Sequence, residues 1–196
     1  MSRLMRTSEI TKRPVVTLAG EDVAQVRDMI FAAAGGELGG FTLAGRGLFG
    51  GPLKQALGWG SVLALGTDAV MIRDVQVLDP VDAVVAQAAS GGGGGNVLKS
   101  EVLTDAGVSL GSVSDVVVQV TDGPGPRCDV VGYEIESSEA LGTKGTKVLI
   151  PLPDTISASG QHLIVPAAAK DFVSQDLAGF GASISAFRAQ LEGGVA

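Results

Sequence analysis

The chain repeats the same order of apolar segments on either side of a run of glycines, and this repeat constrains its fold more than any other feature. Four pairs of segments match: 8–11 with 100–104, 26–31 with 113–118, 61–65 with 147–151, and 66–72 with 159–165. In the second pair, both copies begin with Val-x-Asp and continue into an apolar run. The repeat therefore predicts two similar domains rather than one large domain in a chain of 196 residues.

The glycine run, residues 91–95, separates the two copies. Glycine-rich segments behave as flexible linkers, so we place the domain boundary there. We expect a first domain over residues 1–90, a linker over 90–96, a second domain over 97–178 and a C-terminal tail over 179–196. The tail is expected either to fray or to form a short amphipathic segment with Ile184, Phe187 and Leu191 on one face.

Composition and turn placement favour β structure. Aromatic residues make up 4% of the chain, so its cores must be built from valine, leucine, isoleucine and alanine. β-Branched side chains suit a pleated, half-buried surface, and short apolar runs separated by turn residues are typical of sandwiches and barrels. We therefore predict an all-β protein with minor helices over 80–89 and 166–177. The expected strands cover 14–18, 23–31, 38–43, 61–65, 69–73, 107–111, 112–121, 128–135, 147–152, 155–159 and 162–165.

The net charge of −7 is distributed unevenly along the chain. Residues 1–90 hold 8 basic and 9 acidic residues, whereas residues 91–196 hold 6 basic and 12 acidic residues. Nucleic acid is not expected as a partner, because binding it requires a basic face that neutralises phosphates. Two charged groups are expected to be solvated surface: the basic flank Arg3, Arg6, Lys12 and Arg13, and the acidic face Glu134, Glu136 and Glu139.

No membrane-spanning segment or secretory signal is predicted. No uncharged apolar run reaches about 18 residues, and no apolar stretch follows the basic start as a signal peptide would require. Cys128 is the single cysteine, so no intrachain disulfide can form. We therefore expect a cytoplasmic protein.

Two segments share a pattern of strand, glycine-containing turn, Val-x-Asp and apolar strand. They read Val15-Val16-Thr17-Leu18-Ala19-Gly20-Glu21-Asp22-Val23-Ala24-Gln25-Val26-Arg27-Asp28 and Gly107-Val108-Ser109-Leu110-Gly111-Ser112-Val113-Ser114-Asp115-Val116. The pattern resembles the PRC-barrel domain family, and the resemblance covers most of residues 8–73 and 98–166. Gly111 stands where the family usually has a glycine, whereas Ala24 departs from the pattern.

The resemblance implies two tandem small PRC-like β-barrels that act as a docking module rather than as an enzyme. The family occurs in bacteria and archaea, including a photosynthetic reaction-centre subunit and a ribosome-maturation factor. The reaction-centre subunit carries a membrane helix, and the ribosome factor carries a different amino-terminal barrel. Neither specific function is therefore transferred to this chain.

The segment Gly45-Arg46-Gly47-Leu48-Phe49-Gly50 has the glycine spacing of a dinucleotide-binding turn. A nucleotide is not expected, because the helical turn expected over 52–57 is too short for the crossover of a parallel sheet. The segment is instead the best candidate for binding a protein partner. The candidate partner-binding residues are Arg46, Leu48, Phe49, Leu53, Lys54, Leu57 and Trp59. If these side chains are exposed, they would form an apolar patch with a basic rim. If they fold inwards, they would plug the end of the first barrel. The sequence leaves both alternatives open.

No catalytic, cofactor-binding or metal site is predicted. His162 is the only histidine and is expected to be a partly exposed strand residue, and Cys128 is expected to be a small core residue. Residues 142–147 lack the spacing of a phosphate-binding loop and are expected to form an ordinary loop. Asp28 and Asp115 occupy equivalent positions in the two copies, where we expect each carboxylate to accept a backbone hydrogen bond.

These observations together predict a non-catalytic adaptor or scaffold that docks a protein partner or a second copy of itself. Two linked modules suit this function, because linkage raises the effective concentration at a shared target. Three alternatives remain open at this point: a ribosome- or RNA-associated assembly factor, a protein that contacts the membrane surface, and a small-ligand-binding protein.

Overall fold

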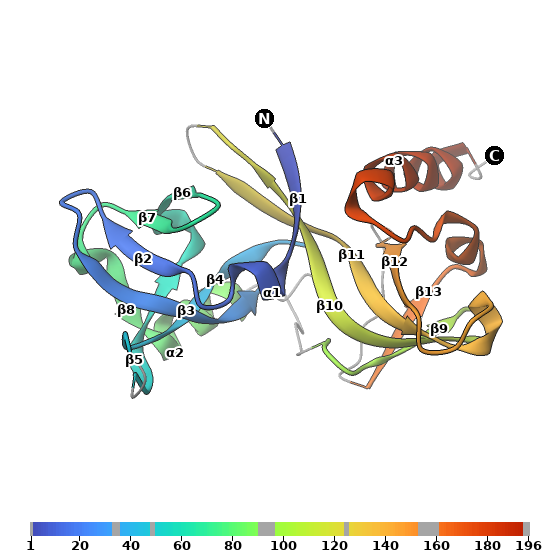
Figure 1. Ribbon diagram of the computed structural model, residues 1–196, viewed down its shortest axis with the longest axis horizontal. Coiled ribbons are helices and arrows are strands. Elements are labelled where there is room, and N and C mark those ends of the chain that lie inside the picture. Colours follow the sequence, from blue (N-terminus) through green and yellow to red (C-terminus); the bar gives the residue numbers. More distant parts are fainter. Residues whose placement is uncertain are drawn as a thin grey trace. The chain divides into compact units, whose positions relative to one another are not determined.

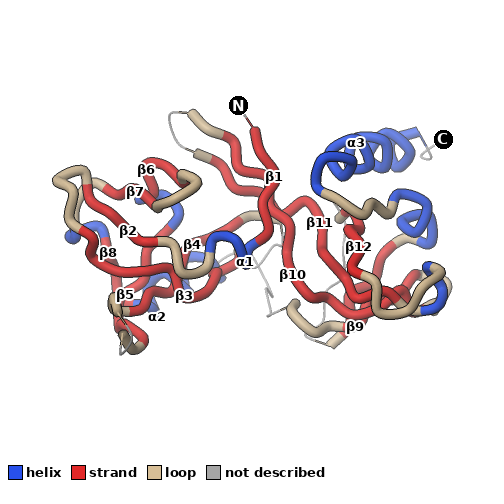
Figure 2. The backbone as a smooth tube through the Cα atoms, in the orientation of Figure 1, coloured by secondary structure: helices blue, strands red, loops and turns tan. Residues whose placement is uncertain are grey.

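The computed structural model describes residues 2–32, 36–47, 50–89, 97–123, 126–152 and 161–193. The linker predicted over 90–96 and the strand predicted over 155–159 lie outside these residues. Contacts divide the chain into two units, both built mainly of strands (Figure 2). The first unit comprises Met1–Arg3, Thr7–Gly94 and Gln119–Asp129, and the second comprises Leu4–Arg6, Gly95–Val118 and Val130–Ala196. Each unit thus includes a segment from the other half of the chain.

In the described part of the first unit, seven strands form one sheet in the order β6-β7-β2-β3-β4-β5-β8 (Figure 1). The strands are β2 (Pro14–Thr17), β3 (Asp22–Phe31), β4 (Leu38–Ala44), β5 (Pro52–Gly58), β6 (Val62–Leu65), β7 (Val70–Ile72) and β8 (Leu78–Pro80), and a short helix, α1 (Thr7–Ile10), precedes them. Strands β2 and β7 are parallel, and the other neighbours are antiparallel. The expected all-β class with minor helices is confirmed.

Helix α2 (Val81–Ala89) packs on this sheet, with Val84 in a buried cluster with Ile30 and Ala56. Two glycines of β4 allow this close approach. A Cβ at Gly39 would lie 2.7 Å from the Cβ of Ala88, and a Cβ at Gly40 would lie 3.1 Å from a methyl group of Val84. The helix expected over 80–89 is therefore present, and the sheet beneath it has no side chains where the helix comes closest.

In the described part of the second unit, a sheet has the order β12-β11-β10-β9-β13, and β1 pairs with β10. The strands are β1 (Ser2–Arg6), β9 (Glu101–Thr104), β10 (Ser109–Thr121), β11 (Arg127–Ser137), β12 (Lys147–Pro151) and β13 (His162–Val165). Strands β13 and β9 are parallel, as β7 and β2 are in the first unit. Three consecutive residues of β10, Val116 to Val118, are buried, so this strand is covered on both faces.

Helix α3 (Leu177–Gly193) covers the outer face of β10, β11 and β12 (Figure 1). Phe180 is fully buried, and its ring lies over Gly132 of β11, where an added Cβ would overlap the ring. The residues expected to form a tail over 179–196 are thus mostly part of a core helix. The helix expected over 166–177 is wrong: Ala167–Phe172 forms a 3-10 turn, and α3 begins where Asp176 Oδ1 accepts the Gly179 N–H at 2.7 Å.

The hairpins β2–β3 and β9–β10 have the same local geometry at a constant spacing along the chain. Lys12 and Lys99 both have positive φ, at 71° and 70°. Each precedes an equivalent ladder, in which Lys12 N–H donates to Val26 O and Lys99 N–H donates to Val113 O, both at 2.8 Å. A β-bulge also lies at the same place in both hairpins. One hairpin of the predicted repeat is therefore present in both halves of the chain.

Two of the four matches predicted between the copies join segments that do not correspond in the structure. The partner of 101–104 is β2, over 14–17, rather than 8–11, which forms α1 and the turn after it. The segment 147–151 forms β12 and pairs with β11, as β5 pairs with β4, so it corresponds to β5 rather than to β6. Short apolar repeats allow such slips, because several strands of one sheet have similar composition.

Candidate functional site

The predicted docking segment is the hairpin that connects β4 and β5. Gly45 N–H donates to Gly51 O at 2.9 Å and Gly50 N–H donates to Gly47 O at 3.1 Å. A side chain at Gly50 would overlap with Gly45 O, so the tight turn itself requires the glycine. The helical turn expected over 52–57 is wrong, because these residues form β5 and pair with both β4 and β8.

Two of the predicted docking residues serve the packing of the first unit. Leu57 is fully buried in β5. Trp59 packs edge-on against Phe41, with ring centroids 5.9 Å apart, and its Nε1 donates to Pro126 O at 2.7 Å. Of the described candidates, Leu57 is therefore not part of an exposed patch, and Trp59 is held by contacts within the first unit.

The other candidates have different surroundings. Arg46 pairs with Asp22 at 2.7 Å, and both side chains are half-exposed. Leu53 is half-buried and Lys54 is exposed, in the part of β5 that extends past its pairing with β8. Two candidates, Leu48 and Phe49, lie outside the described residues.

A surface that sequence reasoning missed lies at β6, at one end of the first sheet. Among the described strands β6 pairs only with β7, so its other edge is open. A bulge at Leu63 leaves this side chain 41% exposed, and Val75, just after β7, is 46% exposed. Leu18 is 67% exposed and follows β2, the strand beyond β7, and its N–H donates to Ile72 O of β7 at 3.0 Å. We call Leu18, Leu63, Ala64 and Val75 the β6 surface.

Strand β6 itself carries no charged side chain. The sequence from residue 55 to residue 67 contains no charged side chain. Exposed strand edges usually carry charged residues or proline, which prevent association with other chains. Their absence could be noticed in the sequence, but the sequence does not show that β6 is an edge strand.

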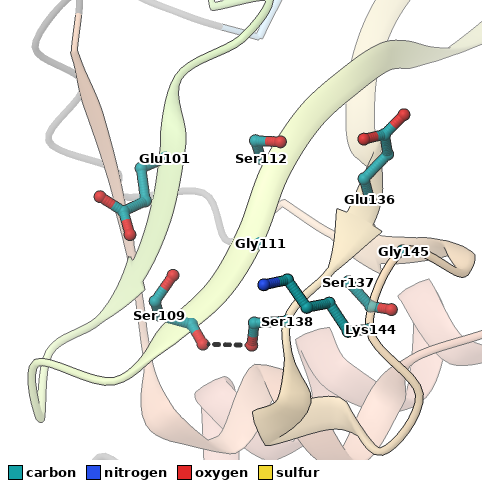
Figure 3. Close-up of a pocket in the computed structure, with 9 residues that line it drawn as sticks. All are labelled: Glu101, Ser109, Gly111, Ser112, Glu136, Ser137, Ser138, Lys144 and Gly145. Carbon is teal, nitrogen blue, oxygen red and sulfur yellow. Dashed lines mark hydrogen bonds between the residues drawn. The ribbon is translucent and has the colours of Figure 1, made fainter.

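The second unit contains an open hollow of about 330 Å³ around Gly111 of β10 (Figure 3). The residues that line it are Glu101, Ser109, Gly111, Ser112, Glu136, Ser137, Ser138, Lys144 and Gly145. In Figure 3 the Lys144 side chain reaches across the hollow toward Gly111 and Ser109, and Glu101 and Glu136 stand on opposite sides. Lys144 forms no hydrogen bond or ion pair with a described residue. Side chains of both charge signs thus line the hollow.

A buried charged cluster lies elsewhere in the second unit. Glu134 is 4% exposed, and its carboxylate accepts hydrogen bonds from Arg6 Nε at 2.5 Å and from Lys147 Nζ at 2.9 Å. Burial opposes its ionisation, but these two hydrogen bonds and the two positive charges outweigh burial and lower the pKa of Glu134. The bond to Glu134 in turn raises the pKa of Lys147.

This cluster corrects two expectations about charged surfaces. Glu134 does not belong to a solvated acidic face. Arg6 is bound to Glu134, and Arg13 donates through Nη1 to Gly66 O and through Nε to Glu9 O, so the basic flank is not simply solvated. Burial, aided by the charge of Arg3, lowers the pKa of Arg13.

Cys128 and His162 have the most reactive side chains of the chain, and both lie on strands. Cys128 is buried, and burial followed by the charge of Asp129 raises its pKa to about 12. His162 lies on β13, with Nε2 3.8 Å from a carboxylate oxygen of Glu101. Asp28 and Asp115 each accept the next residue's N–H at 2.8 Å, as predicted for these equivalent positions.

The described residues place no three or more of the side chains His, Cys, Asp and Glu where they could hold a metal ion together. The helices in this part of the chain are also too short or too polar to span a membrane.

Comparison with known proteins gives a family for the first copy. The family model of the PRC-barrel domain matches residues 3–78. No curated protein matches the chain. The match runs from β1 to the first residue of β8, and residues 79–196 lie outside it. Residues 3–78 of this chain are therefore similar to the PRC-barrel domain family.

Proposed function

We propose that this chain is a non-catalytic adaptor or scaffold that docks a protein partner through the β6 surface of its PRC-barrel domain. The observation that carries this proposal is an open, uncharged strand edge next to three exposed apolar side chains, Leu18, Leu63 and Val75. Contiguous apolar groups on a protein surface mark interaction sites, because covering them removes apolar area from water.

The shape of the edge favours an extended segment of a partner as the occupant. A strand edge offers backbone N–H and C=O groups, and neighbouring side chains add selectivity. The bulge at Leu63 limits the ladder to a short stretch, so side-chain contacts with Leu18 and Val75 must contribute much of the affinity. The near-neutral first half of the chain imposes little charge repulsion on an approaching partner.

The surroundings of the reactive side chains support the absence of catalysis in this proposal. A nucleophilic cysteine requires a thiolate, and the raised pKa of Cys128 keeps its thiol protonated. The single histidine lies with Nε2 3.8 Å from a carboxylate oxygen of Glu101, on strand β13. A docking function requires neither group.

The test compares two single charged substitutions at similarly exposed positions. L63K places a charge in the β6 surface, and V85K places the same charge on α2, where Val85 is 43% exposed. The tagged wild-type chain and both variants are used for affinity capture from cells of the source organism, and light scattering measures the mass of each purified chain. A third variant, K54E, tests the β5 candidate residues separately.

We expect wild type and V85K to capture the same proteins at the same mass, and L63K to lose them. Loss of a higher mass in L63K alone would identify a second copy as the docked protein. Equal capture and equal mass for L63K and V85K would refute the proposal. Selective loss in K54E would instead assign docking to the segment predicted from the sequence.

A further inference from the structure

Backbone atoms of β10 and β11 form the floor of the hollow around Gly111. Gly111 has φ 137° and lies against β11, where an added Cβ would overlap with Glu136 O. Ser138, at the end of β11, donates through Oγ to Ser109 O at 2.6 Å, which holds the two strands together at one side. The 330 Å³ volume corresponds to the smallest of the sites that bind small molecules, of about 300–1,000 Å³.

The charges around this floor do not neutralise one another. Lys144 points into the hollow and has no hydrogen-bond or ion-pair partner among the described residues. Glu136 stands across from it, and neither of its carboxylate oxygens takes part in a hydrogen bond or ion pair within the described chain. An anion would be repelled by Glu101 and Glu136, and a cation would be repelled by Lys144. A molecule that carries both signs would satisfy both.

The equivalent place in the first unit carries larger residues. Ala24 corresponds to Gly111, so a methyl group stands where the second unit has none. Asp22 corresponds to Ser109; the Asp22 carboxylate pairs with Arg46 at 2.7 Å, whereas the backbone O of Ser109 accepts a hydrogen bond from Ser138 Oγ. The second copy thus has glycine and serine where the first has alanine and aspartate.

We infer that the hollow around Gly111 binds a small zwitterion, between an amino acid and a dipeptide in size. Its carboxylate binds the ammonium group of Lys144, and its ammonium group binds Glu136. Hydrogen bonds between ionised groups are stronger than neutral ones, so both charges contribute to affinity. This inference does not depend on docking at the β6 surface.

Nuclear magnetic resonance of the full-length labelled chain tests this binding. Glycylglycine is the probe, and the amide signals of Gly111 and Gly145 report on the hollow. The variants are K144M and E136Q, and K170M is the matched control because Lys170 is exposed on another part of the second unit. A fourth variant, S109D/S138R, rebuilds the ion pair that occupies this place in the first unit.

We expect saturable shifts of both glycine signals in wild type and K170M. K144M should weaken binding about tenfold or more, since it removes a charge-assisted hydrogen bond. E136Q should also weaken it, and S109D/S138R should abolish it while the remaining spectrum stays folded. Absence of saturable shifts in wild type, unchanged binding by K144M, or equal binding of acetate or ethylamine alone would overturn the inference.

Discussion

Replacement of Phe180 by alanine should destabilise the second unit strongly. Phe180 is fully buried among Val117, Val131 and Leu149, and it joins α3 to the outer face of the sheet. Loss of a buried phenylalanine costs about 3–5 kcal/mol, and the cost rises with the cavity that remains. We expect the upper part of this range for F180A, because the floor beneath the ring is Gly132, which has no side chain that could move into the space.

This cost is large compared with the whole stability of a small domain, about 5–15 kcal/mol. Urea unfolding followed by far-ultraviolet circular dichroism measures it. Trp59 is the only tryptophan and belongs to the first unit, so its fluorescence follows that unit separately. Q190A is the control, because Gln190 is exposed on the same helix.

The expected result is a loss of at least about 3 kcal/mol for F180A, as for other buried phenylalanines, and almost none for Q190A. The transition seen by circular dichroism should shift more than the one seen by Trp59 fluorescence. A loss below about 1 kcal/mol, similar to that of a surface substitution, would refute the reasoning. Residues 179–196 would then behave as the tail that the sequence predicted.

Three further predictions concern Gly132 and Glu134 of the second unit, and Cys128 of the first unit. G132A should lower the free energy of unfolding in urea by about 1–3 kcal/mol or more, because its Cβ would overlap both Phe180 and Ile150 O. G179A in α3 should be neutral or stabilising, since a Cβ there meets only Asp176 Oδ1 at 3.5 Å. Equal effects of the two alanines would contradict this packing. E134Q should lower stability at pH 7 by about 1–2 kcal/mol, a value reduced because Lys147 is largely exposed. Since folding lowers the pKa of Glu134, its contribution is present above its ordinary pKa and is lost as the pH falls through the lowered one, so wild type and E134Q should converge in acid; a difference that stays constant to pH 2 would count against it. Cys128, with a pKa of about 12, should react with a disulfide reagent at pH 8 far more slowly in the folded chain than in denaturant, and comparable rates would show that the thiol is accessible.

Several parts of the fold followed from residues that are close in sequence. Strands such as β3 and β10 were predictable, because valine-rich runs bounded by glycine turns have few other stable conformations. The backbone hydrogen bonds of Asp28 and Asp115 were also predictable, since each involves the next residue along the chain. The burial of Cys128 required only its position in an apolar run.

The candidate site was less predictable. The docking segment was judged from its composition, but Leu57 became a core residue because β5 lies between β4 and β8. The β6 surface depends on which strand lies at the end of the sheet, and that order is set by pairings far apart in sequence. The hollow depends on the approach of Ser138 to Ser109, which no local pattern indicates.

The sequence by itself determined that this chain is a β protein with valine-rich cores and a hairpin that occurs in both halves. These features come from local preference and from a repeat, and both can be read one segment at a time. Only the tertiary structure decided that Glu134 is buried between Arg6 and Lys147, that α3 joins the core through Phe180, and that small residues open a hollow in the second copy. Each of these depends on groups brought together from distant segments, because a buried charge or a close backbone contact is stable only when its partner is in place.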